Sequence, residues 1–119
     1  RVFIDSPCTG LGTLRRHADI RWRLRPETIA ESAELDARLL ESVASHVAPG
    51  GILAYATCTV THEENADAVE AFLATEAGAA FEVVPCRNPD LDIELPFFST
   101  VLEPGGPDAH FLALLRRKA

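Results

Sequence analysis

The amino-acid sequence predicts an α/β fold in which parallel strands are joined by helices. Two short apolar segments, residues 2–4 and 52–56, have the length and composition of buried strands. Each runs into a polar loop, and a long segment with helical periodicity separates them. A strand, a helix and a second strand in this order form the crossover unit of parallel sheets. We therefore expect the carboxyl ends of both strands to meet at one edge, where α/β proteins bind ligands.

The first half of the chain is expected to contain one long loop and one long helix. The segment 9–25 lacks a clear period and is predicted to be a loop with at most one helical turn. A helix is predicted to begin at Pro26, because proline suits the first helical position, and to end before Pro49-Gly50-Gly51. Its apolar stripe consists of Ile29, Ala33, Leu39, Leu40, Val43 and Val47.

The second half is expected to add one helix and two strands, at 81–84 and 110–115. Thr61-His-Glu-Glu64 matches a capping box, in which Thr61 caps the helix and Glu64 bonds back to it. That helix is predicted to end near Gly78. The proline-rich segment 85–107 is expected to be irregular, and Arg116-Arg-Lys118 to be a solvated tail. The inward positions of the second helix are Ala66, Val69, Phe72 and Leu73.

Composition and charge narrow the class of protein. A chain of 119 residues with 47% apolar and 24% charged residues is expected to form one globular domain, residues 1–119. No apolar run reaches the roughly 20 residues of a membrane span, so no membrane partner is expected. The net charge is −7, but residues 1–26 carry +4 and residues 27–119 carry −11. The chain as a whole would repel nucleic acid, whereas its first quarter would attract it.

The chain opens on strand residues and contains no methionine, so we expect it to be part of a longer protein. Its three cysteines, Cys8, Cys58 and Cys86, form neither a disulfide framework nor a CxxC zinc pair. The four histidines have no ligand spacing either. We expect no metal site, a reducing cytoplasmic setting, and no role for Cys86 beyond that of a buried thiol.

Two cysteine motifs follow the predicted strands: Asp5-Ser-Pro-Cys8-Thr-Gly10 and Ala56-Thr-Cys58-Thr59. Arg15-Arg-His17 and Asp19-Ile-Arg-Trp22 lie between them, and Glu63-Glu-Asn65 follows the second. With these motifs nearly the whole chain resembles the Sun/NOL1/NOP2 family of RNA cytosine-5 methyltransferases, in particular its bacterial 16S ribosomal RNA enzymes. The tail Pro107-Asp-Ala-His-Phe-Leu-Ala113 resembles the closing strand of that family, although Ala109 and His110 depart from the usual Asp-Gly-Phe-Phe.

The resemblance implies the C-terminal half of a Rossmann-like, S-adenosylmethionine-dependent methyltransferase sheet with flanking helices. The cofactor-binding strands of the family would lie upstream of Arg1. We therefore expect the chain alone to be inactive and to bind S-adenosylmethionine weakly or not at all. The sheet edge left without those strands would favour self-association.

Carbon 5 of cytosine is a poor nucleophile until a cysteine thiolate adds to carbon 6, and this explains the need for a reactive cysteine. Residue types alone leave the roles of Cys8 and Cys58 open, because DNA cytosine-5 enzymes use the Pro-Cys cysteine as nucleophile. The resemblance implies that Cys58 is the nucleophile and that Cys8 assists product release. It also implies that Asp5 lies where base and cofactor meet, as a catalytic and cofactor-binding residue. The alternative for Asp5 is a cap on its own loop.

The target base must leave its stack to enter such a pocket. The basic segment between the motifs is predicted to hold RNA by charge and stacking. Arg15 and Arg16 could instead form structural ion pairs, and Trp22 could be a hydrophobic plug. Two other functions stay open: a non-catalytic RNA-binding module using the loop 15–25, and a thiol redox protein, which the absence of CxxC disfavours. The predicted RNA-binding residues are Arg15, Arg16, His17, Arg21 and Trp22, with Arg23 beside them.

Overall fold

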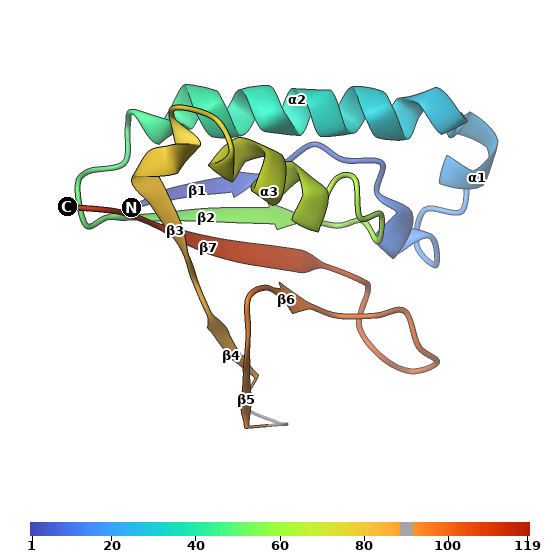
Figure 1. Ribbon diagram of the computed structural model, residues 1–119. Helices are drawn as coiled ribbons and strands as arrows, with labels where there is room; N and C mark the ends of the chain where they lie inside the picture. Colours follow the sequence, from blue (N-terminus) through green and yellow to red (C-terminus); the bar gives the residue numbers. More distant parts are fainter. Residues whose placement is uncertain (89–91) are drawn as a thin grey trace.

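The computed structural model describes residues 1–88 and 92–119. Its centre is a mixed sheet with the strand order β1 (Val2–Asp5), β2 (Ile52–Thr57), β7 (Phe111–Arg117) and β3 (Phe81–Val84) (Figure 1). β1 and β2 are parallel, whereas β7 runs antiparallel to both β2 and β3. The parallel pairing confirms the predicted crossover unit, and β2 gains an antiparallel neighbour on its other side.

Two helices cover one face of this sheet. α2 (Pro26–Ala44) connects β1 to β2, and α3 (Ala66–Leu73) packs beside α2 on the same side (Figure 1). The core lies between helices and sheet, where the rings of Phe72 and Phe81 are 5.5 Å apart. Burying each large apolar side chain contributes about 1.5–3 kcal/mol, so this layer supplies most of the stability of the fold. Fully buried members are Leu40, Val47, Leu53, Tyr55, Val69, Phe72 and Leu115.

Several element boundaries differ from the prediction. The segment 9–25 contains two short helices, η1 (Leu11–Thr13) and α1 (Ile20–Arg23). α2 ends at Ala44, and Val47 is buried just beyond the helix end. α3 ends at Leu73, short of Gly78, which begins η2 (Gly78–Ala80). A Cβ at Gly78 would lie 1.8 Å from the carbonyl oxygen of Phe72, so only glycine fits this turn.

The proline-rich segment is more regular than predicted. β6 (Phe98–Ser99) pairs with the start of β7, and β4 (Cys86–Asn88) pairs with β5 (Ile93–Leu95) in a two-stranded sheet. Proline is tolerated here because these strands are short and peripheral. The part of the prediction that covers residues 89–91 lies outside the described residues.

The predicted solvated tail is instead the end of the last strand. β7 starts at Phe111 and continues to Arg117, since it has partners on both sides. Arg117 donates from Nη1 to the Val47 carbonyl at 2.6 Å. Lys118 donates from its backbone N–H to the Ala80 carbonyl at 2.8 Å. These contacts fix the end of β7 to the turn after α2 and to η2.

β1 lies at an edge of the sheet, with β2 as its partner in the described part of the chain. Its Phe3 side chain is 65% exposed. The unpaired backbone N–H and C=O groups of an open strand edge can pair with another strand. Among the described helices, none has the length and apolar character that crossing a membrane requires.

Candidate active site

The two cysteine loops meet at the carboxyl edge of β1 and β2. The Sγ atoms of Cys8 and Cys58 are 3.2 Å apart, and the Cys58 N–H donates to the Cys8 sulfur at 3.3 Å. The Ser6 N–H donates to the Ala56 carbonyl at 2.9 Å, which extends the parallel pairing beyond the strands. The juxtaposition of Cys8 and Cys58 predicted from the sequence is therefore confirmed.

The backbone on the far side of Cys8 packs directly on the Cys58 loop. The Gly12 N–H donates to the Cys58 carbonyl at 2.9 Å, and the Ala109 N–H donates to the Gly12 carbonyl at 3.0 Å. A Cβ at Gly12 would lie 2.1 Å from the Ala109 oxygen and 2.7 Å from the Cys58 oxygen. Glycine is thus required where the loop after β1 crosses between the Cys58 loop and the start of β7.

The two thiols occupy a half-buried position. Burial, reinforced by the hydrogen bond with Cys58, raises the pKa of Cys8 to about 12. Cys8 is therefore a neutral thiol at pH 7, and its S–H can donate to the Cys58 sulfur. A thiolate is the reactive form of cysteine, and a neighbouring S–H that donates a hydrogen bond to it stabilises this form.

Glu64 lies beneath both loops, and its position corrects the predicted capping box. α3 begins only at Ala66, with Asn65 at its N-cap. Thr61 does bond Glu64, from its hydroxyl to Oε2 at 2.5 Å, but the carboxylate is fully buried and turned toward Thr9 and Thr59. Glu64 therefore makes a long-range contact with Thr9 and does not cap the helix, because the chain turns at residues 62–65 before the helix starts.

Asn65 braces the Cys58 loop from the other side. Its Oδ1 accepts from the Thr57 hydroxyl at 2.5 Å, and its Nδ2 donates to the Thr59 carbonyl at 3.1 Å. These two bonds span the residues on either side of Cys58. The Glu63-Glu-Asn65 segment singled out by the sequence therefore supports the second cysteine motif structurally.

Asp36 is a buried residue of the site that the sequence prediction missed. It lies on α2, is fully buried, and accepts a hydrogen bond from the Ser6 hydroxyl at Oδ1. Its Oδ2 has no hydrogen-bond partner among the described residues. Burial raises the pKa of Asp36, and the Ser6 hydroxyl opposes that effect. Its place in the helical stripe, between Ala33 and Leu40, is the sequence signal that could have identified a buried carboxyl.

Replacing Asp36 by asparagine is expected to stabilise the protein at neutral pH by about 1–2 kcal/mol. The pKa of Asp36 is higher in the folded protein than in the unfolded chain, so the residue costs no stability below the ordinary pKa of an aspartate. As pH rises through the folded pKa, the buried side chain becomes charged and the folded protein loses stability. Asparagine carries no charge and can donate toward the Tyr55 hydroxyl, which itself donates to the Glu64 carbonyl at 2.6 Å. The gain should shrink in acid, as thermal unfolding at pH 8 and pH 4 would show. Glu31→Gln, exposed on the same helix, is the control, and an Asp36→Asn protein less stable than wild type at pH 8 would contradict the expectation.

Asp5 ends β1 with its side chain exposed at the same edge as the two thiols. In the part of the chain that the structure describes, its carboxylate receives no hydrogen bond from the N–H groups of its own loop. The alternative reading of Asp5 as a loop cap therefore has no contact to support it. The side chain is exposed to solvent.

The basic segment divides into a tethered and an exposed part. Arg16 pairs with Asp108 at 2.5 Å, and Arg15 pairs with Asp108 at 3.3 Å and donates to the Gly106 carbonyl at 2.8 Å. The two guanidinium groups hold the pKa of the Asp108 carboxyl below its usual range. Of the alternatives left open by the sequence, the structural ion pair is thus the one formed by Arg15 and Arg16.

α1 presents the exposed part of the basic segment. Trp22 is 84% exposed, which is incompatible with a hydrophobic plug. The Arg21 guanidinium lies 5.8 Å from the Trp22 ring centroid, within range of a cation–π interaction. Arg23 pairs with Asp19 one turn earlier at 2.8 Å, and His17 is exposed.

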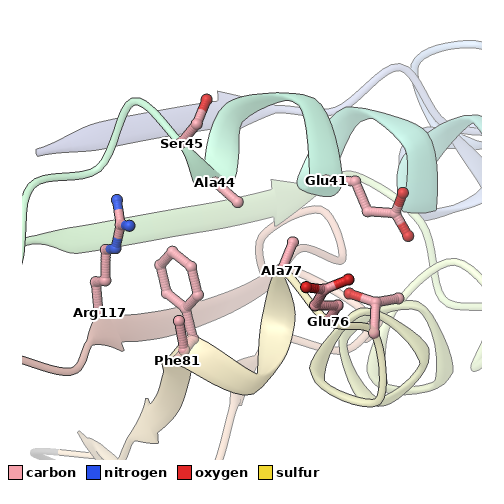
Figure 2. Close-up of a pocket in the computed structure, with 9 residues that line it drawn as sticks. Glu41, Ala44, Ser45, Glu76, Ala77, Phe81 and Arg117 are labelled. Atoms are coloured by element: carbon pink, nitrogen blue, oxygen red, sulfur yellow. The ribbon is translucent and has the colours of Figure 1, made fainter.

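Two hollows accompany this arrangement. One of about 600 Å³ lies at the opposite end of the sheet, where Arg117 faces the end of α2 and η2 (Figure 2). It contains none of the residues that the sequence predicted as functional. The other, of about 400 Å³, borders the loop after Cys58 through Thr59 and His62 and extends to Phe97 and His110. Within residues 1–88 and 92–119 no group of three potential metal ligands is assembled, and Cys86 lies apart in β4.

Comparisons with known proteins match this chain over nearly its full length. The family model of the 16S rRNA methyltransferase RsmB/F matches residues 1–116. Ribosomal RNA small subunit methyltransferase B of Thermus thermophilus is 40% identical over 118 residues, 98% of this chain and 29% of that protein. The protein of the same description from Klebsiella pneumoniae (strain 342) is 49% identical over 74 residues, 62% of this chain and 17% of that protein. This chain thus spans less than a third of these relatives.

Solved structures show the same fold. The crystal structure of PH0851 matches with a TM-score of 0.74 and 34% identity, over 98% of this chain and 26% of that one. The crystal structure of NSun6 from Pyrococcus horikoshii with SFG matches with a TM-score of 0.74 and 22% identity, over 98% of this chain and 29% of that one. At the latter identity the likeness concerns the fold alone.

Proposed function

Because this chain belongs to the RsmB/F family of S-adenosylmethionine-dependent 16S rRNA methyltransferases, we propose that it is the catalytic part of an enzyme that methylates carbon 5 of cytosine in ribosomal RNA. The observation that carries the proposal is the 3.2 Å approach of the Cys8 and Cys58 sulfurs at the strand ends. Residues 1–119 form one partial catalytic domain, and the enzyme acts in the cytoplasm.

Cys58 is the nucleophile in this proposal. Its thiolate forms a bond to carbon 6 of the flipped cytosine, and the electrons of the 5,6 double bond shift so that carbon 5 becomes nucleophilic. S-adenosylmethionine, when bound, supplies the methyl group that carbon 5 accepts. The neutral Cys8 thiol, whose pKa is raised by burial, supports this assignment because it can donate a hydrogen bond to the Cys58 sulfur.

Cys8 assists the release of the product. Release requires that a solvent base take the proton from carbon 5, that its bonding electrons form the 5,6 double bond again, and that the electrons of the bond from carbon 6 to Cys58 Sγ return to the sulfur. Cys58 then leaves as a thiolate. The Cys8 thiol lies 3.2 Å from the Cys58 sulfur, so its S–H is placed to donate a hydrogen bond to that sulfur as it leaves.

Asp5 binds at the junction of base and cofactor in this proposal. Its exposed carboxylate at the end of β1 suits an acceptor for the cytosine amine or for polar groups of S-adenosylmethionine. β1 is an edge strand of the described sheet, so residues 1–119 provide contacts on only one side of such a cofactor site. Residues 1–119 alone are therefore expected to bind S-adenosylmethionine weakly and to be inactive. Calorimetric titration tests this expectation, and tight binding would contradict it.

RNA reaches the site over α1 and the loop after Cys58. The exposed Trp22 offers a stacking surface for a base, and Arg21 and His17 add donors for the backbone. The hollow beside Thr59 and His62 gives room for a neighbouring nucleotide. Arg15 and Arg16 both pair with Asp108, and Arg15 also bonds the Glu103 carbonyl. In this proposal they hold the 103–108 loop in place and neutralise the Asp108 charge near the RNA-binding surface.

Trp22→Ala in the complete protein encoded by the gene is expected to weaken RNA binding by about tenfold, because loss of one stacked base costs about 1–3 kcal/mol. Fluorescence anisotropy with a labelled ribosomal RNA fragment measures the change at several salt concentrations. Leu35→Ala, an exposed apolar side chain on α2 and outside α1, is the matched control. Equal affinities of wild type and Trp22→Ala would remove α1 from the RNA-binding surface.

The experiment that tests the function is methyl transfer from labelled S-adenosylmethionine to unmodified ribosomal RNA by the complete protein. Nucleoside analysis is expected to find the label in 5-methylcytidine. RNA binding without transfer, on every ribosomal RNA substrate tried, would favour the non-catalytic RNA-binding module. Label in any other nucleoside would contradict the proposed chemistry.

A further inference from the structure

We propose that Glu64 is a positioning residue that holds the two cysteine loops at the separation that the reaction requires. This inference rests on the function proposed above and adds a residue to its machinery. Glu64 lies 55 positions along the chain from Thr9, yet its side chain contacts both cysteine loops.

Four donors converge on the Glu64 carboxylate. Oε1 accepts from the Thr9 N–H at 2.7 Å. Oε2 accepts from the hydroxyls of Thr9 at 2.7 Å, Thr59 at 3.2 Å and Thr61 at 2.5 Å. The hydroxyls of Thr9 and Thr59 are also 2.8 Å from each other. Because Thr9 follows Cys8 and Thr59 follows Cys58, one carboxylate links the residues next to both thiols.

The surroundings of Glu64 exclude the roles of a solvated surface charge and of a salt-bridge partner among the described residues. The side chain is fully buried, and no basic side chain pairs with it in the described part of the chain. Both carboxylate oxygens have donors here: one N–H bonds Oε1, and three hydroxyls bond Oε2. A buried charge is costly unless it is fully hydrogen-bonded, so any change that separates the two loops would leave the charge unsatisfied. The carboxylate therefore favours the closed arrangement of the loops, and its full burial keeps it out of contact with a substrate.

The link matters to the reaction because attack and release need two sulfurs at one base. A misplacement of about 1 Å can cost about a hundredfold in rate. Backbone hydrogen bonds from Ser6 to the Ala56 carbonyl and from Gly12 to the Cys58 carbonyl link the loops before and after the cysteines. Glu64 adds a side-chain link at Thr9 and Thr59, the residues directly next to the two thiols.

The test compares Glu64→Ala, Glu64→Gln and the exposed neighbour Glu63→Ala in the complete protein encoded by the gene. Its main readout is the equilibrium between the Cys8–Cys58 thiol pair and its disulfide in glutathione buffers, followed by peptide mass spectrometry. Glutathione disulfide is reduced to two glutathione molecules as the two thiols are oxidised to one disulfide. The equilibrium constant reports how well the protein holds the sulfurs together, whether or not it transfers methyl groups.

Glu64→Ala is expected to lower this constant by about tenfold or more, with a parallel fall in kcat and a KM for RNA within about twofold of wild type. Glu64→Gln should restore most of both values, because the threonine hydroxyls can reverse and accept from the amide. Glu63→Ala should match wild type. A folded Glu64→Ala protein with an unchanged constant, or a Gln variant that fails to rescue, would overturn the proposal.

Thr9→Val keeps the test decisive if Glu64→Ala does not fold. This change keeps the side-chain shape and the Thr9 N–H bond, and removes the hydroxyl link to Oε2. The disulfide constant is expected to fall by about threefold or more, which corresponds to the net worth of one hydrogen bond. An unchanged constant would overturn the proposal. If the wild-type protein transfers no methyl group but the three variants change the disulfide constant as expected, only the proposed function is contradicted.

Discussion

Replacing Cys58 by serine is expected to reduce methyl transfer by at least about a thousandfold, because a serine hydroxyl is not ionised at neutral pH and adds poorly to carbon 6. RNA binding should stay within about twofold of wild type, since the substitution removes neither charge nor an exposed ring. Single-turnover assays with labelled S-adenosylmethionine measure the first quantity, and filter binding of labelled RNA measures the second.

Cys86→Ser is the matched control for that experiment, because Cys86 is half-buried in β4, away from the pair. It should retain full activity. Transfer that survives Cys58→Ser but disappears with Cys8→Ser would reverse the two roles and place this chain with the mechanism of the DNA enzymes.

Cys8→Ser is expected to have an equally large effect of a different kind: the protein should accumulate covalently bound to RNA. In the proposed sequence of steps the bond from Cys58 to carbon 6 still forms, whereas its cleavage loses the assistance of the neighbouring sulfur 3.2 Å away. Denaturing gels with labelled RNA should show a shifted band that requires S-adenosylmethionine and is absent from wild type.

The double variant Cys8→Ser/Cys58→Ser is the control for trapping. It should give no shifted band, because it lacks the proposed nucleophile. A band of equal intensity in the double variant would mean that another residue forms the bond, and absence of the band from Cys8→Ser would assign product release to a different group.

Much of the fold could be predicted from the sequence because its signals are local. Pro26 and the apolar stripe mark α2, and the apolar segments around Ile4 and Leu53 mark β1 and β2. The short strands β4–β6 could not be predicted, since proline-rich segments form strands only where a partner is available. The same holds for Arg116 and Arg117, which are polar in sequence and enter β7 because β2 and β3 flank them.

The candidate site was predictable where it depends on strand ends and not where it depends on long-range contacts. Parallel pairing of β1 and β2 is sufficient to bring Cys8 and Cys58 together. Glu64 matches a capping box, and nothing local distinguishes a cap from a carboxylate that reaches Thr9 across the fold. The partner of Arg15 and Arg16 is equally distant, since Asp108 lies near the other end of the chain.

Cys58 is expected to form the covalent bond to cytosine, and peptide mapping of a trapped complex identifies the bonded residue. Ribosomal RNA that contains 5-fluorocytidine blocks release, because fluorine at carbon 5 cannot leave as a proton does. The complete protein with S-adenosylmethionine should therefore form a stable adduct, and digestion followed by mass spectrometry should locate the nucleotide on the peptide that contains Cys58. A nucleotide on the peptide that contains Cys8 would contradict the account.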